Sequence, residues 1–233
     1  MSETPYDLLL ERILLGEYPP GTNLVEHEIA KEFGVSRTPV REALLRLKVE
    51  GLVKIIPRGG IYVAEAPLRL IREVTQVRMV LEEYLAHLLV ERRTDDWLEE
   101  SQRWLEKSES RWPYLSPREW MKKDAEFHEL LDKASSNEVL SNQLALLRRK
   151  AVLFWGQSTD GQASLRGIIG DFRDTLNAVR ERNFEECARV LRRHVLDHVE
   201  RIQNYMKPEV FRLSEVLQAL ASAVPLVKHA RPR

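Results

Sequence analysis

The strongest constraint on this chain is a pair of short helical segments near its start whose ends are marked by glycine. Two segments with apolar residues at helical spacing stop at Gly34 and Gly51, and glycine readily adopts the left-handed conformation that ends a helix. Ser36 stands where an N-cap belongs, and Pro39 falls in the first turn, where a missing N–H costs no hydrogen bond. The pattern predicts two helices joined by a tight turn.

A further helix precedes this pair, and a β-hairpin follows it. Leu9 and Ile13 repeat at helical spacing. β-branched residues dominate 53–56 and 61–63, and the Pro-Arg-Gly-Gly between them is typical of a hairpin loop. Three helices and a hairpin indicate a winged helix-turn-helix domain, which we place at residues 1–66.

The rest of the chain, residues 67–233, shows helical periodicity and no further strand pattern. With 31% charged residues and only 10 glycines and 11 prolines, the composition also favours helices. We therefore expect a mainly α protein, in which the winged helix is followed by an all-α bundle of six or seven helices. The expected helices, the last of them the optional seventh, span 68–92, 95–111, 116–135, 137–155, 165–182, 184–206 and 209–222. The C-terminal segment 208–233 either covers the bundle or packs on a partner subunit.

The location of the protein is indicated by its cysteine content and its lack of targeting signals. Cys187 is the only cysteine, so no internal disulfide can form, which fits a reducing compartment. The N-terminus lacks a basic region before an apolar run, and no stretch approaches 18 uninterrupted apolar residues. We expect a cytoplasmic protein without a signal peptide or membrane contact.

Positive charge is concentrated in the winged helix although the whole chain is neutral, with 36 basic and 36 acidic residues. Residues 36–60 contain six basic and two acidic side chains. Arg37 and Arg41 lie about 40° apart on their helix, opposite its apolar stripe. Arginine forks bind phosphate oxygens or guanine, and a glycine loop lets a wing approach the DNA backbone. The pattern favours double-stranded DNA as partner, and solvated charges on an exposed helix are the alternative.

Residues 21–53, from Gly-Thr-Asn-Leu-Val-Glu-His through Val-Ser-Arg-Thr-Pro-Val-Arg-Glu-Ala to Gly-Leu-Val, closely resemble the winged-helix signature of GntR-type bacterial transcription regulators. The resemblance implies DNA contacts from the recognition helix, from the wing and from the start of the preceding helix. By position these contacts fall on Arg37, Thr38, Pro39, Arg41, Gly59, Gly60 and His27. Relatives often carry arginine where this chain has His27, which implies a weaker or pH-dependent phosphate contact.

A second group of candidate residues lies in the helical region. Asp124 and His128 are four residues apart and therefore share a helix face with apolar residues. His194 and His198 fall on the apolar stripe of a later helix. A carboxylate with imidazoles suits a divalent first-row metal, and a metal site of Asp124, His128 and His194 is one interpretation. A satisfied polar cluster without metal is the other.

Residues 71–194 resemble the all-helical effector domain of the FadR subfamily. Many members hold a metal with one Asp and three His, and small carboxylate effectors bind beside it. Asp124, His128 and His194 match three of these positions, and Phe172 occupies the fourth. The resemblance therefore implies a divalent metal such as Zn, Ni or Mn with an incomplete ligand set. Asp171 or Asp174 is a substitute ligand, and a metal-free site for a larger or more apolar effector is the alternative.

The same resemblance identifies candidate effector-binding residues, namely Arg78, Phe172 and His198. Arg78 stands where relatives commonly offer an arginine toward the effector, and a guanidinium is a natural partner for a carboxylate. An i,i+4 salt bridge with Glu82 is the alternative role.

Together these observations predict a transcription regulator and not an enzyme. We expect a homodimeric repressor that binds an inverted-repeat operator and is released by a small organic acid. Two competing functions are a metal-dependent hydrolase using Asp124, His128 and His194, and a sequence-independent DNA-binding protein. No HExxH, G-x-S-x-G or phosphate-binding glycine loop supports the first, and the zero net charge argues against the second.

Overall fold

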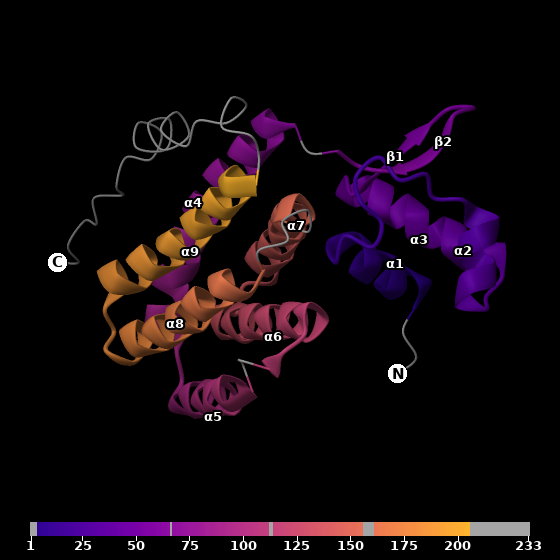
Figure 1. Cartoon of the computed structure of the whole chain (residues 1–233). Coiled ribbons are helices and arrows are strands. Elements are labelled where there is room, and N and C mark those ends of the chain that lie inside the picture. The colour runs from indigo at the N-terminus through magenta and orange to yellow at the C-terminus, as the bar shows by residue number, and fades with distance from the viewer. Residues whose placement is uncertain (1–3, 66, 112–113, 156–160, 206–233) are drawn as a thin grey trace.

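The computed structural model describes residues 4–65, 67–111, 114–155 and 161–205 (Figure 1). Within these ranges the side chains of residues 68, 117, 153–155, 161–167 and 198–205 are not described. The expected seventh helix at 209–222, like the whole segment 208–233, lies outside the described residues.

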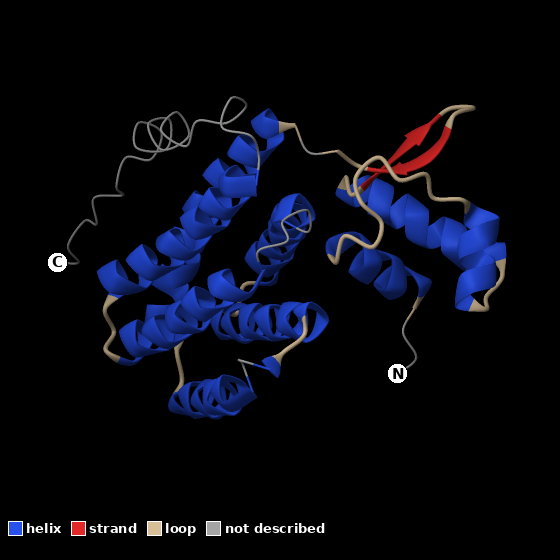
Figure 2. Ribbon diagram, viewed as in Figure 1, coloured by secondary structure: helices blue, strands red, loops and turns tan. Residues whose placement is uncertain are grey.

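The first part is a winged helix with the predicted order of elements. It contains α1 (Pro5–Leu14), α2 (Glu26–Phe33), α3 (Arg37–Glu50), β1 (Val53–Ile56) and β2 (Gly60–Val63). The two strands form an antiparallel hairpin that projects from the helices (Figure 2). Gly34 and Gly51 end α2 and α3 with φ of 66° and 78°, as expected. Ser36 occupies the N-cap of α3, but its side chain makes no capping hydrogen bond, contrary to the expected cap.

The core of the winged helix extends into the next helix. Leu9 and Ile13 of α1 pack with the buried side of α3, which includes Leu44. Ile71 and Val74, in the first two turns of α4, belong to the same buried cluster. The short connection before α4 therefore joins two parts that share apolar packing.

Six helices follow in the described residues, and their bounds agree closely with the sequence pattern. They are α4 (Leu68–Arg92), α5 (Asp95–Arg111), α6 (Pro117–Ser135), α7 (Glu138–Trp155), α8 (Gly161–Arg180) and α9 (Phe184–Tyr205). Helix α8 differs most from its expected range, 165–182. It begins earlier, at Gly161. It ends earlier because Arg182 adopts a φ of 53° and the Asn183 N–H donates to the Ala178 carbonyl.

Helix α4 runs through the middle of the bundle and packs against α9, α7, α6 and α8. Helix α5 lies at the bottom of the bundle in this view, below α6 and α8, whereas α6 and α7 lie on the side that faces α1 (Figure 1). The bundle core is strongly apolar and contains Trp120, Phe127 and Phe172 among its fully buried side chains. Among the described helices, none is long and apolar enough to cross a bilayer.

Candidate DNA-binding surface and ligand cavity

The start of α3 presents two arginines to solvent. Arg37 and Arg41 expose 71% and 73% of their side chains, while Val40 between them is fully buried. The carboxylate of Glu26, in the first turn of α2, lies 3.4 Å from Arg37 and 3.7 Å from Arg41. Exposed ion pairs contribute little free energy, so both guanidiniums can exchange Glu26 for a phosphate or a base. The sequence analysis does not predict that Glu26 pairs with these arginines, although an acidic residue in the first turn of α2 is a visible feature of the sequence.

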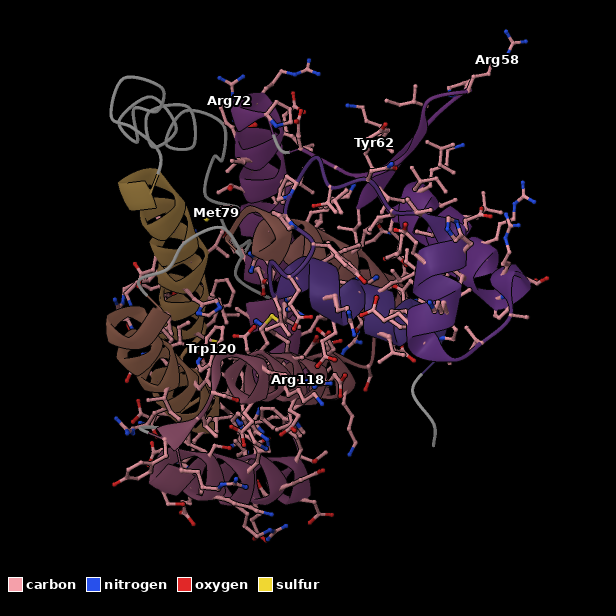
Figure 3. All side chains as sticks on the ribbon, turned by 45° about the vertical axis from the view of Figure 1, so that its right-hand side comes forward. Arg58, Tyr62, Arg72, Met79, Arg118 and Trp120 are labelled. Atoms are coloured by element: carbon pink, nitrogen blue, oxygen red, sulfur yellow. The ribbon has the colours of Figure 1, made fainter. Side chains whose placement is uncertain are left out.

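The wing is a tight turn that requires glycine. The Gly59 N–H donates to the Ile56 carbonyl at 2.9 Å, and a Cβ on Gly59 would lie 2.7 Å from the Ile56 side chain. Gly60 has a φ of 120°, which other residues rarely adopt. Tyr62 donates from its hydroxyl to the Gly59 carbonyl at 2.8 Å and braces the turn. Arg58 stands at the far tip of the wing (Figure 3), which adds a cation to the surface expected to face DNA.

The remaining expected DNA contacts lie on the same small domain. His27 is exposed in the first turn of α2, and Thr38 is exposed in the first turn of α3. Pro39 is half-buried at the position where α3 starts. Their contact with DNA stays a prediction, and their placement is consistent with it.

The structure brings the three candidate metal ligands together from two helices. Asp124 and His128 lie on α6 and His194 on α9, and one ligand atom from each lies within 4.8 Å of the others. All three residues are buried. The Asp124 carboxylate lies 3.7 Å from His128 Nε2. One carboxylate and two imidazoles form a donor set that fits a divalent first-row metal with further coordination positions left open.

Phe172 on α8 lies beside this cluster, where the resemblance places a third histidine. Its ring centroid is 6.4 Å from that of His128 and 6.0 Å from that of His194, and it stacks on Phe127 at 3.8 Å. The fourth position is therefore taken by an apolar ring that belongs to the core.

The two acidic residues considered as substitute ligands have other partners. Asp171 lies 3.3 Å from His194 Nδ1 and accepts hydrogen bonds from Arg193. Burial raises the pKa of the Asp171 carboxyl, but the hydrogen bonds and charges of His194 and Arg193 outweigh it and lower that pKa. Asp174 pairs with Arg193 at 2.8 Å. Asp171 thus orients the His194 ring from behind, as carboxylates often do for metal-binding histidines.

Arg78 forms the expected i,i+4 salt bridge with Glu82, and its contact with an effector stays a prediction. Arg78 is buried with only 2% exposure, and its guanidinium lies 3.3 Å from Glu82. Glu82 also accepts two hydrogen bonds of 3.2 Å from Arg148 of α7, and Arg148 pairs with Asp132 of α6 at 2.9 Å. Burial raises the pKa of Glu82, but the charges of Arg148 and Arg78 outweigh burial and lower it. The sequence gives no signal for Arg148, because its partners lie 66 and 16 residues away.

A cavity of about 370 Å³ lies between α1, α6 and α7, within the size range of ligand pockets. Asp124, His128 and Arg148 line it together with apolar side chains from all three helices. The apolar lining comprises Leu10, Leu14, Met121, Ala125, Ala145 and Val152. Apolar side chains combined with polar groups that fix the orientation of a ligand are typical of a small-molecule site. The expected effector-binding residues Arg78 and Phe172 are not part of this lining, and the side chain of His198 lies outside the described residues.

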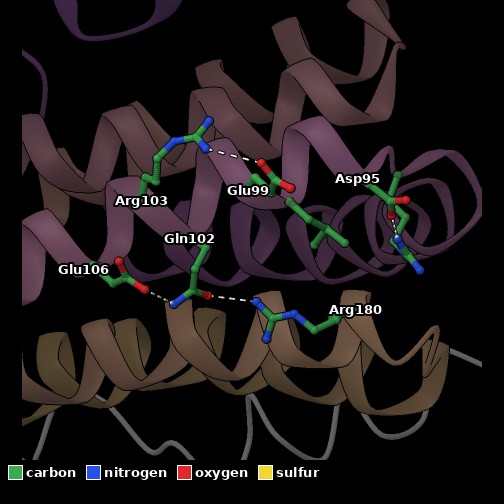
Figure 4. Close-up of a pocket in the computed structure, with 8 residues that line it drawn as sticks. Asp95, Glu99, Gln102, Arg103, Glu106 and Arg180 are labelled. Carbon is green, nitrogen blue, oxygen red and sulfur yellow. Dashed lines mark hydrogen bonds and ion pairs between the residues drawn. The ribbon is translucent and has the colours of Figure 1, made fainter.

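A second hollow, of about 510 Å³, lies between α5 and α8 (Figure 4). Its polar side chains pair with one another. Arg103 lies 3.4 Å from Glu99, and Gln102 accepts a hydrogen bond from Arg180 and donates one to Glu106. These pairs leave the cavity beside Asp124 and His128 as the better candidate for a ligand.

Comparison with known protein families agrees with both halves of the structure. The family model described as "Bacterial regulatory proteins, gntR family" matches residues 2–63, and the FCD domain model matches residues 73–197. The second match alone covers more than half of the chain.

Individual relatives share this architecture over most of their length. The chain is 28% identical over 194 residues to the uncharacterized HTH-type transcriptional regulator YdhC of Bacillus subtilis, covering 83% of this chain and 85% of YdhC. It is 26% identical over 203 residues to the HTH-type transcriptional repressor RspR of Escherichia coli, covering 85% and 87%.

A solved structure also shares the fold. The structure of E. coli McbR/YncC superposes with a TM-score of 0.70 at 24% identity, over 92% of this chain and 95% of that one. The domains and relatives are those of transcription regulators, which excludes the hydrolase interpretation. The chain belongs to the GntR family of bacterial transcription regulators, with an N-terminal winged helix-turn-helix and an effector-binding FCD domain of the FadR type.

Proposed function

We propose that the protein is a cytoplasmic repressor that binds an inverted-repeat operator as a homodimer and leaves it when a small carboxylate effector binds. The observation that carries this proposal is the exposed pair Arg37 and Arg41 at the start of α3, in a chain that also holds a ligand-sized cavity. A relative with 26% identity, RspR, is named a repressor, which supports the direction of regulation.

DNA recognition is tested by replacing Arg41 with alanine. Loss of a guanidinium that contacts a base should cost about 1–3 kcal/mol, or about 5–150-fold in affinity. The operator is first selected from fragments of the source genome at physiological salt with competitor DNA. Its affinity for the variant is then measured by fluorescence anisotropy. The matched control is Arg103→Ala, which removes an exposed arginine on α5. If Arg41→Ala bound the operator as tightly as the wild type, the proposed contact would be contradicted.

The homodimer forms through an exposed apolar face of α4. Val77, Val80 and Tyr84 lie on one side of this helix, and each leaves about half of its surface exposed, at 49%, 51% and 48%. Such a stripe is self-complementary across a two-fold axis, because each residue meets its own copy or a neighbour in the stripe. A second copy of the chain would bury it.

Placing a charge in this stripe should separate the subunits. Val80→Glu is expected to give a monomer at micromolar concentration, because two carboxylates would be buried without partners. Sedimentation velocity compares it with the wild type and with Val139→Glu, which changes a valine on α7 that is 74% exposed. A dimeric Val80→Glu variant, or a monomeric wild type, would show that α4 is not the interface.

The cluster of Asp124, His128 and His194 holds a divalent first-row cation such as Zn, Ni or Mn. The donor set and the carboxylate of Asp171 behind His194 support this assignment. When bound, the cation would add positive charge beside the cavity that Asp124 and His128 line.

A further inference from the structure

We propose that the effector cavity is shared between the two domains, and that an anionic effector binds there by taking the place of two carboxylates of the winged helix, Glu11 and Glu50. The inference rests on the proposed function, since it names how the same cavity would control the winged helix.

Helix α1 of the winged helix forms one wall of the cavity. Leu10 and Leu14 contribute apolar surface, and Glu11 on the same helix lines the cavity as well. The opposite walls come from α6 and α7 of the FCD domain. A ligand in this space therefore touches the DNA-binding domain directly, and the space changes whenever α1 moves relative to the bundle.

Ion pairs close this interface with carboxylates of the winged helix and cations of the FCD domain. Glu11 accepts hydrogen bonds of 2.5 and 2.6 Å from Arg118 of α6, and Lys122 lies 3.8 Å from the same carboxylate. Figure 3 shows Arg118 on the side of α6 that faces α1. Glu50, the last residue of α3, lies 3.2 Å from Arg149 of α7. Lys122 and Arg149 both line the cavity, so an anion inside it reaches the cations that these two carboxylates now neutralise.

Glu50 has further partners within the winged helix, and Glu11 is partly exposed. Glu50 accepts two hydrogen bonds from the Tyr6 hydroxyl, at 2.8 and 2.9 Å, and lies 3.4 Å from Arg46. Glu11 is already partly open to solvent, with 17% of its side chain exposed. Glu50 would therefore keep its partners within the winged helix when a ligand carboxylate took its place beside Arg149, and Glu11 would gain contact with water.

Three carboxylates of the FCD domain line the cavity, Asp124, Glu129 and Asp132, and two of them are paired. Asp132 is paired with Arg148, and Asp124 lies beside His128. Apart from Asp7, Glu11 and the cations Lys122, Arg148 and Arg149, the rest of the lining is apolar. A monocarboxylate with an apolar body of several carbons thus matches the chemistry, with its charged end toward Lys122 and Arg149.

The test measures binding of hexanoate to the full-length protein by calorimetry, with hexylamine as the probe of opposite charge. Hexanoate should bind and hexylamine should not. Glu11→Gln removes the competing carboxylate, so it should strengthen hexanoate binding about two- to fivefold, the effect expected of a partly exposed ion pair. Arg149→Gln removes a cation and should weaken binding about tenfold or more. Glu17→Gln, which changes an exposed carboxylate beside Arg12 that does not cross the interface, is the matched control.

Hydrogen exchange on the same samples reports the contact between the domains. Hexanoate should raise amide exchange in the part of α1 that faces α6 and α7, and Glu11→Gln should do so without ligand. Preferred binding of hexylamine, no binding of hexanoate, or equal affinities of Glu11→Gln and Glu17→Gln would each overturn the inference. These measurements contain no DNA, so failure to find a specific operator would overturn the proposed function alone and leave this result standing.

Discussion

Replacing Glu82 with glutamine is expected to lower the free energy of unfolding by about 3–5 kcal/mol, the usual cost of removing one partner from a buried ion pair. Glu82 is 1% exposed and lies between two buried guanidiniums, those of Arg78 and Arg148. Without its charge, two buried cations that repel each other keep a single carboxylate partner, Asp132 beside Arg148. Urea unfolding at pH 7, followed by tryptophan fluorescence, measures the loss.

The pH dependence of this difference identifies its electrostatic origin. The folded-state pKa of Glu82 is lowered, so its stabilising effect is complete above the unfolded value of about 4.3. This stabilisation is lost as the pH falls through the lower pKa that Glu82 has in the folded protein. The difference between wild type and Glu82→Gln should therefore be constant from pH 7 to pH 5 and shrink in stronger acid.

A surface pair on the same helix serves as the control for Glu82. Glu73→Gln breaks an exposed i,i+4 pair with Arg69 and should cost no more than about 0.5 kcal/mol. A loss of less than about 1 kcal/mol for Glu82→Gln would show that the buried network contributes little to the free energy of unfolding.

Phe172→His is expected to raise the affinity of the FCD cluster for Zn²⁺ by more than about 10–100-fold, the amount that partners behind a metal ligand typically contribute. The Phe172 ring lies 6.0 Å from the His194 ring and 6.4 Å from the His128 ring. These distances are close to the 5.5 Å between the two histidines. An imidazole on the same backbone position is therefore within reach of a shared ion and completes a four-ligand set.

Competition with a zinc-binding dye measures this affinity, and metal analysis of the dialysed protein gives the stoichiometry. Phe172→Leu is the control, because it removes the ring without adding a ligand. It should leave zinc affinity near that of the wild type, although loss of the stacked contact with Phe127 lowers stability. Equal zinc affinity for the histidine and leucine variants would show that position 172 does not face the metal.

Most of the fold follows from the sequence because its signals are local. Gly34 and Gly51 end helices with left-handed φ values, and the two strands flank a loop that needs glycine at Gly59 and Gly60. Helix α8 was predicted less accurately, since its end depends on the left-handed conformation of Arg182, a residue type that carries no such signal.

The candidate site follows from the sequence only in part. Asp124, His128 and His194 were found because a spacing of four and an apolar stripe mark them, and the structure brings them together. The role of Arg148 depends on which faces of α4, α6 and α7 meet, and no local pattern encodes that meeting. The same holds for the pairing of Glu11 with Arg118, which are 107 residues apart.

Because α4 shares its apolar core with the winged helix, a tilt of this helix is coupled to the position of the DNA-binding domain. Ile71 and Val74 fix its first turns inside the winged helix, while the rest of its 25 residues runs through the bundle. At 1.5 Å per residue, the helix is about 37 Å long, so a tilt of about 5° at its bundle end moves its other end by about 3 Å. That displacement is close to the rise of one base pair, about 3.4 Å. A tilt of α4 of this size would therefore displace the winged helix by about the spacing of neighbouring base pairs.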